Sequence, residues 1–168
     1  MNGWWVASFI VLWVVVIVLS GVVIALARQI GLLHLRISPT GALDTAEGPP
    51  VGEMAPRLAP VLPGRETLVV FGSDGCGLCH DLLPSVNTLA RSEPGMVVVV
   101  ASASAGFVEQ VRAPVVPVAD VAAVASYRIR STPYAVYLDS AGIVGAKGIV
   151  NTLEHLESVV ERGRSLAS

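Results

Sequence analysis

The chain has 168 residues, of which 53% are hydrophobic and 14% are charged, and its formal net charge is −2. A soluble domain typically has about 45–50% apolar and about 25% charged residues. The composition therefore excludes a chain that is soluble along its whole length, and it excludes a disordered one. The slightly acidic balance argues against nucleic acid as a partner, because phosphate binding needs a basic face. Two cysteines cannot build a disulfide-rich scaffold.

The apolar excess lies in residues 4–27, where only Ser8, Ser20 and Gly21 fall outside the hydrophobic set. A helix needs about 20 apolar residues to cross the hydrocarbon core of a bilayer. We therefore expect residues 4–27 to form one transmembrane helix in contact with membrane lipid, after a short N-terminal tail of residues 1–3.

A cleaved signal peptide is the alternative for this segment, since Ala25 and Ala27 provide a small-x-small site. The apolar run is, however, longer than the usual signal-peptide core of about 7–15 residues, and no basic residue precedes it. Trp4 and Trp5 also stand where an interfacial aromatic anchor would stand. We therefore predict an uncleaved anchor.

The orientation of the anchor is indicated by its flanking charges. Arg28 and Arg36 are the basic residues next to the span, and both follow it. The positive-inside tendency, taken alone, would place the C-terminal part in the cytoplasm. This placement has to be compared with the compartment that the chemistry of the C-terminal part requires.

A juxtamembrane segment and linker are expected over residues 28–50. Residues 28–37 could continue the helix or lie along the membrane interface. Residues 38–63 contain six prolines and little periodicity, which indicates a tether and a domain entry rather than a packed element. The globular domain is expected over residues 51–168, which is long enough for a single core.

The pattern after residue 64 alternates between strand-like and helix-like segments. Short apolar runs predict five strands, at 67–71, 96–101, 115–118, 135–138 and 143–147. Helical spacing of apolar residues predicts four helices, at 82–92, 106–111, 120–127 and 152–162. This order predicts an α/β fold with a central mixed sheet that helices cover on both faces.

Both cysteines of the chain, Cys76 and Cys79, lie between the first predicted strand and the first predicted helix. Cys76 is thereby placed at a helix N-terminus, where unpaired N–H groups and the positive end of the helix dipole favour a thiolate. Cys79 lies one turn further on the same side and can close a disulfide with Cys76. The pair can therefore support a dithiol–disulfide cycle, in which one cysteine attacks and the other resolves a mixed disulfide.

The same cysteines allow three other interpretations. A structural zinc site needs about four ligands, and the chain has no further cysteine and no closely spaced histidine pair, so no metal is expected. Cys76, Cys79 and His80 match the C-x-x-C-H signature of covalent haem attachment, although haem c domains are mostly helical and strands surround this motif. The pair can also be purely structural.

A second motif, around Pro133, favours the redox interpretation of the two cysteines. Residues 68–79, LVVFGSDGCGLC, resemble the strand and C-x-x-C entry of thioredoxins, and residues 127–138, YRIRSTPYAVYL, resemble the later part of the same domain. In that family a cis-proline begins the strand that faces the C-x-x-C, and Pro133, preceded by Thr132, matches it. The two motifs stand in the right order and in the right elements, and the resemblance covers residues 51–158.

The subtype is indicated by the N-terminal half of the chain. The anchor, the lead-in VGEMAP at 51–56 and Thr132 resemble the membrane-anchored thioredoxins of the TlpA/ResA type, and residues 27–56 look most like the MauD subfamily of methylamine utilisation. The resemblance implies a thioredoxin-like fold and an extracytoplasmic thiol–disulfide oxidoreductase that forms, reduces or isomerises disulfides in client proteins, such as a dehydrogenase subunit. It also implies no cofactor beyond the redox-active disulfide Cys76–Cys79, and a MauE-like membrane protein as redox partner.

The chain departs from the thioredoxin pattern around the cysteines. Gly75 stands where thioredoxins usually have Trp, Leu78 where they often have Pro, and His80 where Lys is common. The buried acid of thioredoxin corresponds to Val70. No carboxylate of the first strand can therefore take a proton from Cys79, which speaks against efficient thioredoxin-like reduction.

The remaining site residues follow from the resemblance. Pro133 has no N–H that would compete with a substrate strand, so Thr132 and Pro133 are the expected substrate-binding loop. Gly77, Leu78 and His80 are expected to modulate the two thiols. His80 can supply positive charge near them, or it can be an ordinary surface residue of the helix.

Thiol exchange with secreted clients requires a compartment in which disulfides persist. We therefore predict a single-pass membrane protein with its catalytic domain outside the cytoplasm, against the weak signal of the two arginines. Two alternatives stay open. One is a haem-binding or haem-handling protein that uses the C-x-x-C-H motif, and the other is a non-catalytic subunit for membrane assembly.

Overall fold

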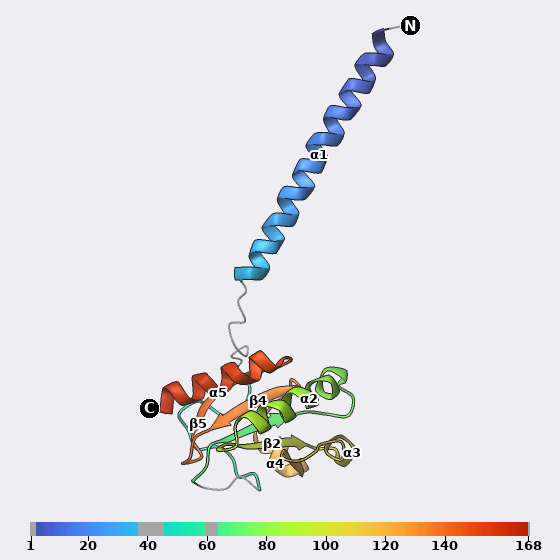
Figure 1. The fold of residues 1–168 in the computed structure, drawn as a ribbon. Coiled ribbons are helices and arrows are strands. Elements are labelled where there is room, and N and C mark those ends of the chain that lie inside the picture. The colour runs from blue at the N-terminus through green and yellow to red at the C-terminus, as the bar shows by residue number, and fades with distance from the viewer. Residues whose placement is uncertain (1–2, 37–45, 60–63, 168) are drawn as a thin grey trace. The chain divides into compact units, whose positions relative to one another are not determined.

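The computed structural model describes residues 3–36, 46–59 and 64–167. The chain divides after Ser38 into two units, an N-terminal helix and a globular unit (Figure 1). Each unit is considered by itself.

The N-terminal unit is the helix α1, Gly3–Arg36. Its first 19 residues, Gly3–Gly21, have a mean hydropathy of 2.3. The helix is thus long and apolar enough to cross a membrane. It continues to Arg36 without a break, so of the two conformations considered for residues 28–37 the structure has the helix, as far as it describes them.

The globular unit is built on a five-stranded mixed sheet in the order β3-β2-β1-β4-β5. The strands are β1 Thr67–Phe71, β2 Val97–Ser102, β3 Val116–Ala119, β4 Tyr134–Leu138 and β5 Val144–Ile149. β1 pairs in parallel with β2 and β2 with β3, whereas β4 runs antiparallel to both β1 and β5. The predicted order of elements and the mixed sheet are confirmed.

Helices cover both faces of the sheet, as predicted. The helices of the globular unit are α2 Gly77–Ser92, α3 Ala105–Val108, α4 Val121–Ser126 and α5 Leu153–Ala167. Figure 1 shows α2 and α5 on one side of the sheet and α4 on the other. Because successive side chains of a strand point to opposite faces, Leu68 and Val70 of β1 join the core under α2 and α5, while Val69 and Phe71 join the core on the α4 side.

Two helix boundaries differ from the sequence prediction by five residues each, and α3 ends at Val108 rather than at 111. α2 begins at Gly77 rather than at 82. The prediction used the spacing of apolar residues, which detects only the part of a helix that packs against the core. The first turn of α2 is marked by its N-cap residue, Cys76. α5 extends to Ala167 rather than ending at 162. Its Arg164 is held by Glu66 and Glu93 at 2.8 and 2.9 Å, which ties the last turn to the globular unit.

The contact between α5 and the sheet depends on a glycine. A Cβ atom on Gly163 would overlap the ring of Tyr137, and one on Gly145 would lie 2.9 Å from the Gly163 carbonyl oxygen. Tyr137 is fully buried, so its ring cannot move aside without opening the core. The absence of a side chain at these positions sets how closely α5 approaches β4 and β5.

We expect Gly163→Ala to destabilise the globular unit by about 2 kcal/mol. The overlap with a buried ring places the cost of overpacking at the upper end of its usual range of about 1–3 kcal/mol, and the better helix propensity of alanine returns about 1 kcal/mol. All three tryptophans lie in α1, so unfolding should be followed by the near-ultraviolet circular dichroism of the buried tyrosines, in urea. Gly95→Ala is the control, since a Cβ there meets nothing within 4 Å. Equal unfolding midpoints for the two variants would contradict the packing argument.

Candidate active site

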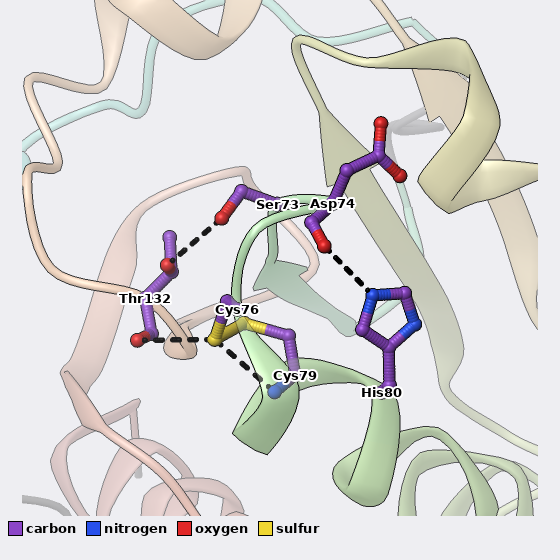
Figure 2. Close-up of a disulfide and its surroundings, with 6 residues drawn as sticks. All are labelled: Ser73, Asp74, Cys76, Cys79, His80 and Thr132. Carbon is purple, nitrogen blue, oxygen red and sulfur yellow. Dashed lines mark hydrogen bonds between the residues drawn. A yellow bond between two sulfur atoms is a disulfide. The ribbon is translucent and has the colours of Figure 1, made fainter.

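Cys76 and Cys79 form a disulfide at the N-terminus of α2, where Cys76 is the N-cap residue (Figure 2). The backbone N–H of Cys79 donates a hydrogen bond to the Cys76 sulfur at 3.1 Å. A helix N-terminus leaves its first N–H groups without intrahelical partners, and one of them points at this sulfur. In the reduced protein the same N–H stabilises a thiolate on Cys76.

The two sulfurs differ in their access to solvent. Cys76 is partly exposed, whereas Cys79 is 2% exposed and belongs to the core between α2 and the sheet. Val70, which stands where thioredoxins have an acid, is buried in the same core cluster. β1 therefore brings no carboxylate to Cys79, and a partner molecule can reach Cys76 but not Cys79.

The loop before β4 lies against Cys76. The peptide bond between Thr132 and Pro133 is cis, and the Thr132 carbonyl oxygen lies 3.5 Å from the Cys76 sulfur (Figure 2). In the disulfide this sulfur has no proton, so the approach is a contact and becomes a hydrogen bond only when Cys76 is a thiol. The hydroxyl oxygens of Ser73 and Thr132 lie 3.4 Å apart and join the two loops. Thr132 and Pro133 are thus brought together with the disulfide.

Gly77 and Leu78, the two residues between the cysteines, lie on the exposed first turn of α2. Leu78 is 58% exposed, which is unusual for a leucine and presents an apolar side chain beside the disulfide. Gly77 has no atom within 4 Å of the position of a Cβ, so this turn is open to an approaching partner.

The His80 ring is held between two acceptors. Its Nε2 lies 3.0 Å from the Asp74 carbonyl oxygen and its Nδ1 lies 3.0 Å from the Gln110 side-chain oxygen. A carbonyl can only accept, and Gln110 uses its amide nitrogen to donate to the Gly106 carbonyl, so both ring nitrogens donate. The hydrogen bonds to Asp74 and Gln110 raise the pKa of His80 and favour the imidazolium. Its ring also packs edge-on against Phe107.

Glu47 is a site residue that the sequence prediction missed, because it lies in the stretch that was expected to be a linker. Its carboxylate accepts hydrogen bonds from the backbone N–H groups of Arg130 and Ser131 at 3.0 and 2.9 Å. These bonds lower the pKa of the Glu47 carboxyl. An acidic residue among prolines and glycines leaves no periodic signal, so no pattern in the sequence could have found it.

The haem interpretation of the C-x-x-C-H motif does not fit this geometry. The two sulfurs are bonded to each other, and both nitrogens of the His80 ring are hydrogen-bonded within the protein. In the part of the chain that the structure describes, no group of three or more His, Cys, Asp or Glu side chains is placed to hold a metal ion.

The family of this chain is shown by its similarity to known sequences. The chain is 35% identical to methylamine utilization protein MauD of Paracoccus denitrificans, over 98% of this chain and 92% of that protein. It is 34% identical to MauD of Methylorubrum extorquens, over 95% and 87%. The chain belongs to the MauD family. No protein-family model matches it.

Solved structures agree on the thioredoxin-like fold. DsbF of MTB, solved in mixed oxidised and reduced forms, matches with a TM-score of 0.50 and 19% identity, over 62% of this chain and 82% of that one. A Chlorobium tepidum protein described as the thiol:disulfide interchange protein DsbE matches with a TM-score of 0.51 and 20% identity, over the same shares. The globular unit therefore has a thioredoxin-like fold, with a C-x-x-C disulfide at the N-terminus of α2.

We expect His80 to titrate above the ordinary histidine value of about 6.5, because both of its hydrogen bonds favour the charged ring. Gln110→Leu should lower this pKa part of the way, since the Asp74 carbonyl remains, and Gln110→Glu should raise it further. The stabilisation from these bonds is complete below the unfolded-state pKa and is lost as the pH rises through the folded-state pKa. A histidine NMR titration of the full chain in detergent measures all three values, and a wild-type pKa at or below 6.5 contradicts the assignment.

Proposed function

We propose that this MauD-family chain is a membrane-anchored oxidoreductase that exchanges disulfides with extracytoplasmic client proteins, with Cys76 as the attacking thiol and Cys79 as the resolving thiol. The observation that carries the proposal is the contrast between the two sulfurs. Cys76 is partly exposed at a helix N-terminus and faces the cis-proline loop, whereas Cys79 is 2% exposed. Only the first sulfur can meet another protein.

The reaction is a two-electron exchange. When the chain acts as an oxidant, a client thiolate attacks the Cys76 sulfur, a mixed disulfide forms and Cys79 leaves as a thiolate. The second client thiolate then attacks the client sulfur of the mixed disulfide and releases the Cys76 thiolate. The client has lost two electrons and two protons, and the chain holds them as a dithiol. The reverse sequence reduces a client disulfide, with Cys79 resolving the intermediate.

Thr132 and Pro133 form the client-binding loop in this proposal. Pro133 carries no N–H, so the edge of the loop next to Cys76 presents carbonyl oxygens to an extended client segment. Leu78, two residues after Cys76, adds an exposed apolar side chain. Together they suit an unfolded or extended segment that carries a cysteine.

The electrostatics of the site favour a thiolate on Cys76 and an oxidising or isomerising role. The N–H of Cys79 points at the Cys76 sulfur, and the His80 imidazolium adds positive charge to the first turn of α2. Stabilisation of the reduced form makes a dithiol pair a stronger oxidant. Val70 supplies no base that would activate Cys79 for reduction.

In the proposed arrangement α1 crosses the membrane, with residues 4–27 in lipid. The globular unit, which includes the domain predicted over residues 51–168, lies outside the cytoplasm. The support is the apolar length of α1 and the need of secreted clients for a compartment in which disulfides persist. The name of the MauD relatives indicates methylamine utilisation, so a dehydrogenase subunit of that process is the proposed client. A MauE-like membrane protein is the proposed redox partner.

Cys79→Ala should trap mixed disulfides between Cys76 and clients, because the resolving thiol is missing. The adducts should appear on non-reducing gels of cells that express the variant and vanish on reduction. Cys76→Ala, and the variant that lacks both cysteines, are the controls and should form none. If Cys79→Ala forms no adducts and Cys76→Ala has no phenotype, the chain is a non-catalytic assembly subunit instead.

A reporter fused to the C-terminus tests the proposed orientation. Alkaline phosphatase, which needs disulfides to fold, should be active in such a fusion, and a reporter that works only in the cytoplasm should be inactive. The reverse pattern would place the globular unit in the cytoplasm, as the two arginines after the span suggest when taken alone.

A further inference from the structure

The cis-proline loop is held by residues that precede β1 in the globular unit, in the described stretch 46–53. The Glu47 carboxylate accepts three hydrogen bonds from this loop. They come from the backbone N–H of Arg130 at 3.0 Å, the backbone N–H of Ser131 at 2.9 Å and the Ser131 hydroxyl at 3.1 Å. Both carboxylate oxygens are used. The loop residue next to Ser131 is Thr132, whose carbonyl touches the Cys76 sulfur.

The backbone of Glu47 is itself fixed to the sheet. Its carbonyl oxygen accepts hydrogen bonds from the Tyr134 hydroxyl at 2.9 Å and from the Lys147 ammonium at 2.8 Å. Lys147 is 9% exposed, so its charge is satisfied by this carbonyl and by that of Gly48 at 3.5 Å. A buried cation held by backbone carbonyls fixes their position strongly, since leaving it unpaired is costly.

Gly48 allows the segment to turn at this point. Its φ is +77°, a conformation that other residues rarely adopt. A Cβ on Gly48 would be in ordinary van der Waals contact with the ring of Tyr134 at 3.5 Å, so the backbone conformation, and not a lack of space, requires the glycine. The turn therefore brings the Glu47 side chain to the loop and the Glu47 carbonyl to β4 and β5 at the same time.

We infer that Glu47 is a positioning residue for the client-binding loop, and that the segment of residues 46–53 thereby sets the loop geometry that a client meets at Cys76. This inference rests on the proposed oxidoreductase function. Glu47 touches no sulfur, so it acts through Ser131 and Thr132 rather than on the reacting atoms. Without its carboxylate the two amides face water, and the loop next to Cys76 loses its only charged anchor among the described residues.

The test compares two reductants of the oxidised full chain in detergent micelles. Dithiothreitol is too small to need the loop, whereas a ten-residue peptide with two cysteines must bind along it. Glu47→Ala should raise the KM for the peptide at least about fivefold, the effect of about one net hydrogen bond. It should leave the peptide kcat and the dithiothreitol rate unchanged. Glu47→Gln, which keeps one acceptor oxygen, should restore part of the peptide affinity.

Glu53→Ala is the matched control. Glu53 lies in the same segment, and within the described residues its carboxylate accepts no hydrogen bond, although its backbone pairs with Val144. This variant should behave as the wild type with both reductants. Lys147→Met should also raise the peptide KM. It removes the ammonium that holds the Glu47 carbonyl, so the backbone that positions the Glu47 carboxylate is no longer fixed.

Hydrogen exchange of the amides provides a readout that is independent of activity. In Glu47→Ala the amides of Arg130 and Ser131 should exchange faster, while those of β1 and β4 should not. Unchanged exchange at both amides, an unchanged peptide KM, or an equal fall of the peptide and dithiothreitol rates would each overturn the inference. A wild-type chain that reacts with neither reductant would overturn the oxidoreductase proposal itself, and this inference with it.

Discussion

The antiparallel pairing of β1 with β4 is the constraint on which the active site depends. In this register Phe71, the last residue of β1, lies opposite Tyr134, the first residue of β4. The chain therefore leaves β1 toward Cys76 at the same end of the sheet at which it enters β4 from Pro133. This places the Thr132 carbonyl 3.5 Å from the Cys76 sulfur, although 56 residues separate them in the sequence. A slip by one residue would turn the strand's side chains to the wrong faces and move the two loops apart.

The position of the disulfide between surface and core separates the roles of its sulfurs. Negative charge is favoured on Cys76, which accepts an N–H from the first turn of α2. It is disfavoured on Cys79, which is buried among apolar side chains that include Val70. In the reduced protein the thiolate is thus favoured on the partly exposed sulfur of Cys76. On the side of α2 that faces Asp74 and Gln110, the hydrogen bonds to these two residues raise the pKa of His80 and so favour positive charge on its ring.

The lead-in segment has a structural role that its composition hides. It contains prolines and glycines and resembles a simple tether, yet Glu47 and Gly48 are bound by the buried Lys147 and by Tyr134. The Glu47 carboxylate also accepts hydrogen bonds from the backbone N–H groups of the cis-proline loop. The globular unit thereby includes part of the predicted linker of residues 28–50. Within the globular unit, Glu47 and Gly48 thus lie beside the cis-proline loop that contacts Cys76.

The sequence by itself determined the apolar helix, the order of strands and helices, and the cysteine pair at a helix N-terminus. These features depend on neighbours within a few residues, so they appear as runs, periods and spacings. The tertiary structure alone decided the anchoring of Glu47, the burial of Lys147 and the engagement of His80 by Gln110. Their partners lie 30 to 100 residues away. A contact between residues so distant leaves no period in either segment, because it exists only once β1, β4 and β5 have paired.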